Sequence, residues 1–142
     1  HGSISAESIL LADRGGVLGP PRPTGPLGAV ARVDGWQNLD VLDPDLVRGA
    51  SPNRSTDIWA LAATVHQVCS GASLYPGLER DQAVTGVQKV LYGPPIVASD
   101  TAPAIAELLE ACFNRDPSKR PATALALAER LDELDEIGAA GD

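Results

Sequence analysis

One apolar run in the middle of the chain constrains its fold more than any other segment. The run IWALAATVHQVCSG follows Ser55-Thr56-Asp57 and stops at Gly71. Ser, Thr and Asp favour helix starts because their side chains accept hydrogen bonds from free backbone N–H groups, and Gly favours helix ends. The run is apolar on almost every side, so we predict a helix at the centre of the domain, capped by Ser55-Thr56-Asp57.

Two helices are expected after this one, because apolar residues recur at helical spacing. The first covers about 79 to 91 and is stopped by Gly93-Pro94-Pro95, since proline cannot continue a helix. The second runs from about 101 to 113, with Asp100 or Thr101 as its cap. Its apolar face consists of Ile105, Leu108, Leu109 and Cys112.

A last helix is expected from about Thr123 to Ile137, with an inner face of Leu127, Leu131 and Leu134. The first third of the chain differs in character. Residues 9 to 11 (ILL) form a strand candidate, followed by the turn-rich DRGG at 13 to 16. Residues 19 to 28 are dense in Pro and Gly, which excludes a helix or a central strand and indicates a loop, and GAVARV at 28 to 33 could form a short edge strand. We therefore predict one mainly α domain with a loop-rich N-terminal third.

Composition excludes several classes of partner. The 142 residues suit a single domain, and the net charge of −8 argues against nucleic-acid binding, which needs clustered Lys and Arg. No apolar run approaches the roughly 18 residues that can span a bilayer. Cys69 and Cys112 lie in apolar helical stretches without metal-binding spacing, so we expect buried, reduced thiols in a cytoplasmic domain, with a structural disulfide as the alternative.

Four short motifs occur in an order that is typical of one family. They are HGSISAESILL at 1 to 11, Pro44-Asp45, DIWALAATV at 57 to 65 and DPSKRPAT at 116 to 123. They resemble the catalytic loop H-R-D-x-K-x-x-N-I-L-L, the P-E pair that closes the activation segment, D-x-W-x-x-G and D-P-x-x-R-P-T of eukaryotic-type Ser/Thr protein kinases.

The resemblance covers residues 1 to about 137 and implies a helical domain like the C-terminal lobe of a kinase, a truncated kinase fold. It divides the chain into a catalytic-loop remnant at 1–11, an activation-segment remnant at 21–45 and a helical core at 55–137. Residues 138–142 are expected to form a linker or tail.

The positions that carry the chemistry of the family are changed. Phosphoryl transfer needs a carboxylate that orients the substrate hydroxyl, a Lys, and oxygen ligands for Mg²⁺. The matching positions hold Ser3 for the catalytic Asp, Ser5 for the Lys and Ser8 for the metal-binding Asn. Pro21 stands where the D-F-G Asp is expected. The resemblance therefore implies a pseudokinase, with no catalytic residue, metal site or cofactor.

Residues that are structural in the family are retained. Asp57 is expected to accept hydrogen bonds from the backbone of residues 1 to 3, and His1 to pack on the central helix near it. Asp45 and Arg120 are expected to form a buried ion pair. Asp45 is one methylene shorter than the Glu of the family, so a looser pair is expected.

Inactive relatives of this kind resemble scaffolds that an active Ser/Thr kinase phosphorylates and a forkhead-associated domain then reads. Accessible candidates for the modified residue are Thr123, Thr24 and Thr101, although Thr101 and Thr123 could instead act as helix caps. The resemblance extends to the cytoplasmic kinase-like domain of mycobacterial MviN-type lipid II flippases. It thus implies a domain of an inner-membrane-anchored protein with a role in cell-wall synthesis.

Two other functions stay open. An inert spacer between a membrane segment and another domain predicts no phosphorylation-dependent partner. An atypical phosphotransferase would take catalytic groups from a missing N-terminal lobe, because Glu7 and Asp13 are the only acids near the catalytic-loop remnant. Apolar surface normally covered by that lobe is expected to favour self-association of the chain.

Overall fold

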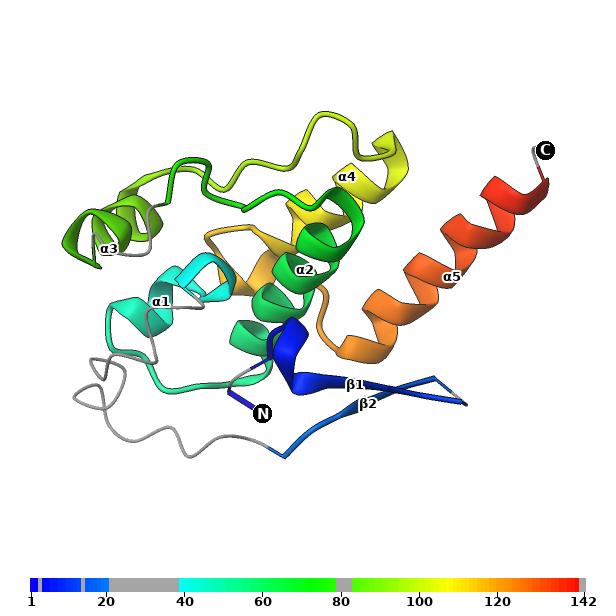
Figure 1. Cartoon of the computed structure of the whole chain (residues 1–142), viewed down its shortest axis with the longest axis horizontal. Helices are drawn as coiled ribbons and strands as arrows, with labels where there is room; N and C mark the ends of the chain where they lie inside the picture. Colours follow the sequence, from blue (N-terminus) through cyan, green and yellow to red (C-terminus); the bar gives the residue numbers. More distant parts are fainter. Residues whose placement is uncertain (3, 14, 21–38, 79–82, 141–142) are drawn as a thin grey trace.

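Helices dominate the architecture (Figure 1). The computed structural model describes every residue except 3, 14, 21–38, 79–82 and 141–142. Its α-helices are α1 (Pro44–Val47), α2 (Arg54–Ser70), α3 (Ala83–Tyr92), α4 (Pro103–Cys112) and α5 (Ala124–Ala140), with short 3₁₀ helices η1 (Ala6–Ser8) and η4 (Pro117–Lys119). Strands β1 (Ile9–Ala12) and β2 (Gly15–Leu18) form an antiparallel ribbon. The prediction of a mainly α domain is confirmed.

Helix α2 is the central element, as its all-round apolar sequence predicts. Most of its first three turns are buried, including Ile58, Trp59 and Ala62. The helix ends where predicted, at Gly71, whose φ of 67° is the left-handed conformation that glycine adopts without strain.

The predicted cap of α2 is wrong by a few residues. Asn53 is the N-cap, and its side-chain oxygen accepts hydrogen bonds from the backbone N–H groups of Ser55 (2.8 Å) and Thr56 (3.1 Å). The Thr56 hydroxyl in turn accepts from the backbone N–H of Asn53 at 2.9 Å. Ser55, Thr56 and Asp57 therefore lie in the first turn of the helix, which begins at Arg54, and Asn53 before that turn satisfies two of its free donors.

The hydrophobic core packs α2 against α4, and α3, α5 and the segments around residues 39–41 and 74–75 contribute further buried residues. The Trp59 ring packs edge-to-face on Phe113, with ring centroids 5.2 Å apart. The apolar faces expected on α4 and α5 are confirmed: their buried residues are Leu108, Leu109, Cys112 and Leu127, with Ile105, Leu131 and Leu134 partly buried against them.

The starts of α4 and α5 differ in how they are capped. Helix α4 begins at Pro103, and its N-cap, Ala102, makes no side-chain capping bond, so the expected cap by Asp100 or Thr101 is wrong. The fixed φ of proline suits the first helical position, which sets the start later than expected. At α5, the Thr123 hydroxyl accepts a hydrogen bond from the backbone N–H of Ala126 at 3.1 Å, so Thr123 does act as a cap.

The ribbon includes the predicted strand at 9 to 11 and makes the following turn shorter than expected. Gly16 and Gly15 pair with Leu11 and Ala12 inside the ribbon. The ribbon carries large exposed apolar side chains, of which Leu11 is 91% exposed. The edge strand considered at 28 to 33 lies outside the described residues.

Two further expectations are tested by burial and length. Cys112 is buried as expected, whereas Cys69 is exposed, because it lies in the last turn of α2 beyond the packed part of the helix. Within the described ranges, no helix combines the length and apolar character needed to cross a membrane.

Candidate functional site

The catalytic-loop remnant at 1–11 contains η1 and most of β1. Ser8 closes this turn with its own side chain: its hydroxyl accepts from the backbone N–H of Ser5 at 2.9 Å and donates to the carbonyl of Ser5 at 2.8 Å. Ser5 itself is buried. Ser3 and Pro21 lie outside the described residues. The two described positions thus offer neutral hydroxyls, and that of Ser8 is engaged within its own turn.

Asp57 joins this segment to the central helix. Its carboxylate accepts hydrogen bonds from the backbone N–H of Gly2 at 2.8 Å and from the backbone nitrogen of His1 at 2.6 Å. The His1 ring is expected to pack on α2. The contact it makes is with the chain just beyond β2, where its Nε2 lies 2.9 Å from the carbonyl oxygen of Gly19. Asp57 therefore fixes the remnant on α2, while the His1 ring bonds to the chain beside the ribbon.

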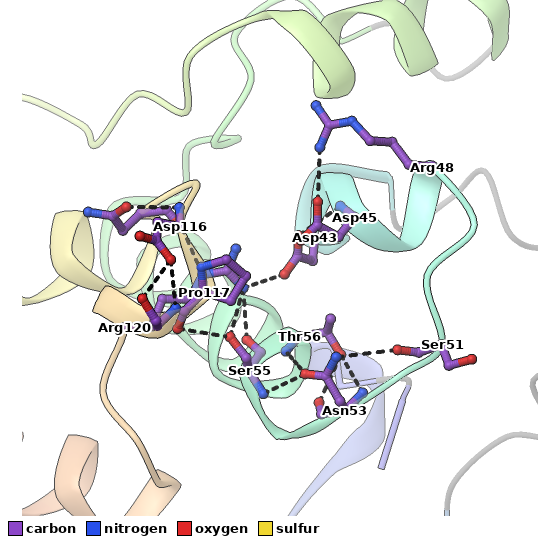
Figure 2. Close-up of polar contacts among 12 residues, drawn as sticks. Asp43, Asp45, Arg48, Ser51, Asn53, Ser55, Thr56, Asp116, Pro117 and Arg120 are labelled. Carbon is purple, nitrogen blue, oxygen red and sulfur yellow. Dashed lines mark hydrogen bonds and ion pairs between the residues drawn. The ribbon is translucent and has the colours of Figure 1, made fainter.

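A buried ion pair connects the start of α1 with the turn before α5, and it differs from the expected pair (Figure 2). Arg120 donates to the carboxylate of Asp43, and both side chains are only 1% exposed. Its guanidinium also donates to the carbonyls of Asn114 (2.8 Å) and Ser55 (3.0 Å). Arg120 thus holds together η4, the start of α2 and the start of α1.

Asp45, the partner expected for Arg120, points elsewhere. It forms an exposed ion pair with Arg48 at 3.0 Å, one turn along the chain. Asp43 is the N-cap of α1 and accepts from the backbone N–H of Asp45 at 2.9 Å. The short Asp45 side chain ends near its own helix, whereas Asp43, just before it, faces the interior.

Sequence reasoning missed Asp43, although a signal was present. An Asp directly before Pro44 has the pattern of a capping residue followed by the favoured first helical residue. That pattern locates the cap. It does not show that the second carboxylate oxygen of Asp43 faces a buried guanidinium, because Arg120 is 77 positions away.

The DPSKRP segment also stacks on the core. Arg120 lies over the Trp59 ring, with its guanidinium carbon 5.0 Å from the ring centroid. Asp116 caps η4 by accepting from the hydroxyl of Ser118 (2.7 Å) and from its backbone N–H (3.0 Å). Both hydrogen bonds lower the pKa of Asp116 below its usual value, and the bond from the Ser118 hydroxyl has the larger effect.

The three candidate phosphorylation sites lie in different environments. Thr123 is exposed at the start of α5. The hydroxyl of Thr101 is buried and has no hydrogen-bond partner among the described residues. Thr24 lies outside the described residues.

A cleft of about 680 Å³ lies beside Thr123, between α4 and α5. Pro121 and Ala126, on either side of Thr123 in the sequence, both line it. Its charged residues have both signs: Lys119, Arg120, Arg130, Glu107, Glu129 and Glu133. In the described ranges, no three His, Cys, Asp or Glu side chains gather in a way that could hold a metal ion.

Comparison with known proteins gives a distant relationship to protein kinases. No family model matches the chain. The chain is 29% identical to the serine/threonine-protein kinase PknK of Mycobacterium bovis over 93 residues. This alignment covers 64% of this chain and 8% of that protein. It is 27% identical over 92 residues to the serine/threonine/tyrosine-protein kinase HT1 of Arabidopsis thaliana, covering 63% of this chain and 23% of that protein.

A third relative is the E3 ubiquitin-protein ligase KEG of Arabidopsis thaliana, 29% identical over 108 residues, or 73% of this chain and 6% of that protein. The chain therefore spans less than a quarter of the length of each of these relatives. The first two comparisons show a low-identity similarity to one part of Ser/Thr protein kinases.

Proposed function

We propose that this chain is the C-terminal lobe of a pseudokinase that acts as a phosphorylation-regulated scaffold. The observation that carries the proposal is the state of the catalytic-loop remnant. Ser8, at the position of a metal-binding Asn, uses its hydroxyl to close the η1 turn with Ser5, at the position of the catalytic Lys. A neutral hydroxyl engaged in this way is a poor ligand for Mg²⁺, which favours carboxylate oxygens.

The loss of chemistry contrasts with the retention of the scaffold. Asp57 still anchors the backbone of Gly2, and Arg120 still forms a buried ion pair, although with Asp43. Phosphoryl transfer depends on the positioned carboxylate, Lys and metal ligands, whereas binding of a partner needs only a stable fold. This combination favours a binding role over an enzymatic one.

Thr123 is the proposed switch. It is exposed, and its position at the start of the long helix α5 places it at the positive end of the helix dipole. A phosphate there adds a charge of about −1.5 to −2 that the helix start tolerates, together with oxygens that an Arg-bearing pocket can bind. We propose that a forkhead-associated domain reads it after an active Ser/Thr kinase has modified it.

The parent protein is proposed to be a membrane-anchored regulator of cell-wall synthesis similar to mycobacterial MviN-type lipid II flippases. This part of the proposal depends on the sequence motifs described above. It predicts that the partner captured by the phosphorylated domain is found with cell-wall synthesis proteins at the inner membrane.

Phosphorylation mapping tests the scaffold directly. The full kinase-like domain is treated with an active bacterial Ser/Thr kinase, phosphosites are mapped by mass spectrometry, and binding of a purified forkhead-associated domain is measured by calorimetry. We expect modification of Thr123 and binding that disappears in Thr123→Ala. Thr123→Ser keeps the hydroxyl that caps α5, so it is the control for folding and not for binding by a reader of phosphothreonine.

Two outcomes would overturn the proposal in different ways. If no threonine is modified and the forkhead-associated domain binds neither the treated domain nor Thr123→Ala, the result would favour the inert spacer. Magnesium-dependent phosphorylation of a peptide by the full kinase-like domain alone would favour the atypical phosphotransferase.

A further inference from the structure

A histidine at the centre of the fold is left without a role by the function proposed above. His66 lies in the second half of α2 and is fully buried. Its Nε2 is 2.9 Å from the backbone nitrogen of Ala98, which donates a hydrogen bond to it. Ala98 lies in the segment 93–102, which connects α3 with α4.

This hydrogen bond fixes the protonation state of the ring. Because a backbone N–H is always a donor, Nε2 must carry no proton, and in the neutral ring the proton is on Nδ1. Nδ1 is buried and has no hydrogen-bond partner among the described residues. The closed structure therefore requires a neutral ring and leaves the N–H group at Nδ1 unsatisfied.

Segment 93–102 is anchored at its start, where the carbonyl of Gly93 accepts a hydrogen bond from the guanidinium of Arg115 at 2.7 Å. Beyond that point, few anchors other than the bond to His66 hold it. The backbone N–H of Ile96 donates to the carbonyl of Leu74 at 2.9 Å, and Val97 is partly buried against the core. The backbone N–H of Thr101 donates to the carbonyl of Ala98 at 3.0 Å, which closes a turn within the segment itself.

Buried polar groups without partners favour opening of segment 93–102. The Thr101 hydroxyl in the same turn is also buried without a partner among the described residues. Buried polar groups without partners raise the free energy of the closed state, and opening would return both Thr101 and His66 Nδ1 to water. Local opening of such weakly anchored segments is common in folded proteins.

We propose that His66 is a pH-sensitive latch that holds segment 93–102 closed when its ring is neutral and releases it when Nε2 is protonated. A proton on Nε2 would place an N–H donor against the N–H of Ala98, so the hydrogen bond would be lost and a charge would be buried. Release of the segment lets water reach the ring and the Thr101 hydroxyl.

Burial of His66 favours the neutral ring in the closed state, and the charge that lies nearby opposes it. Desolvation by burial lowers its pKa below the usual value of 6.5, and the negative charge of Asp100, in the facing segment, partly opposes this. Among the described residues, Asp100 is the charged group that acts on the ring. Since the folded pKa is depressed and the open ring titrates near 6.5, the closed state is fully favoured above that pH and weakens below it.

Hydrogen exchange of the Ala98 amide, measured by NMR on the whole chain, tests the latch. We expect its protection factor, corrected for the intrinsic exchange rate, to be constant from about pH 8 to 7 and to fall by up to about tenfold per pH unit below 6.5. Amides of α4 serve as the internal reference for global unfolding. In the same samples, ¹⁵N shifts of the ring report whether Nδ1 carries the proton at pH 7.5.

Two variants separate the latch from general acid sensitivity. His66→Gln keeps a side-chain acceptor that does not titrate, so we expect its Ala98 protection to be independent of pH over the same range. His1→Ala removes the only other histidine and is expected to behave as the unaltered chain.

An Ala98 protection factor that stays constant below pH 6.5, or that falls only in step with the α4 amides, would overturn the proposal. So would a ring proton found on Nε2 at pH 7.5. The ring measurement needs no substitution, so the proposal can be rejected even if His66→Gln fails to fold.

Discussion

Two aspartates separated by one residue at the start of α1 have opposite environments. Asp43 is buried against Arg120, whereas Asp45 is partly exposed and pairs with Arg48 on the next turn. A buried charge whose partner is removed remains desolvated, but an exposed charge is solvated by water. The same substitution should therefore have very different effects at the two positions.

We predict that Asp43→Asn lowers the free energy of unfolding by about 3–5 kcal/mol, because it leaves the Arg120 guanidinium buried without its counter-charge. Asparagine keeps an oxygen that can cap α1, so the loss reports the ion pair. Asp45→Asn is the matched control and should cost less than about 1 kcal/mol. Urea denaturation of both variants measures the difference, and equal losses would contradict the buried pair at Asp43.

The sequence could predict Arg120 as a buried structural cation but not its partner. The expectation of Asp45 follows from its place after Pro44, which matches a P-E pair. The partner is decided by side-chain reach in three dimensions: a carboxylate one methylene shorter than Glu ends near Arg48, and Asp43 takes the interior position. A one-dimensional motif contains no information on that reach.

At the scale of elements, the distribution of apolar residues predicts each long helix, as an all-round apolar run for α2 and as periodic faces for α3, α4 and α5, whereas the caps are harder to predict. Ser55, Thr56 and Asp57 are all residue types that favour capping, yet Asn53 satisfies the first turn of α2. At α4, Pro103 fixes the start. Helix existence depends on a face of many residues, whereas a cap depends on the conformation of one residue, which several polar neighbours could supply.

We predict that Asn53→Ala lowers the free energy of unfolding by about 1 kcal/mol, because the N–H groups of Ser55 and Thr56 lose their acceptor. Asn53→Asp retains an acceptor and adds a charge that the helix dipole favours, so its stability should be unchanged or slightly higher. Thermal unfolding followed by circular dichroism compares the two. A loss of similar size in both variants would show that the cap contributes little.

At the scale of the whole molecule, the core contains two acidic groups that resist ionisation. Burial raises the pKa of Tyr75 to about 12 from its ordinary value of 10.0, and nearby charges modify it less. Burial likewise raises the pKa of Cys112 to about 11 from 9.0. Because the folded chain holds these protons more tightly than the unfolded chain does, stability is full below pH 9 and declines as the pH rises above it.

We predict a loss of stability in two stages in alkali, from Cys112 between pH 9 and 11 and from Tyr75 between pH 10 and 12. Each raised pKa corresponds to a loss of roughly 2–3 kcal/mol in the free energy of unfolding once the group has fully ionised. Tyr75→Phe should remove the second stage, and it breaks no hydrogen bond of the Tyr75 hydroxyl among the described residues. Tyr92→Phe, at an exposed position, is the control.

Urea denaturation at successive pH values gives the free energy of unfolding against pH for Tyr75→Phe and for the control Tyr92→Phe. An unchanged second stage in Tyr75→Phe would show that its hydroxyl reaches water in the folded chain.

The pair of Asp43 and Arg120 also has a consequence for how the chain is made. During translation, Asp43 leaves the ribosome 77 residues ahead of Arg120. A nascent chain that has not yet reached Arg120 would have to bury the carboxylate without its cation, which is strongly unfavourable. The start of α1 should therefore not reach its buried position until the DPSKRP segment has emerged, and ribosomes stalled before it should display a domain that proteases still digest.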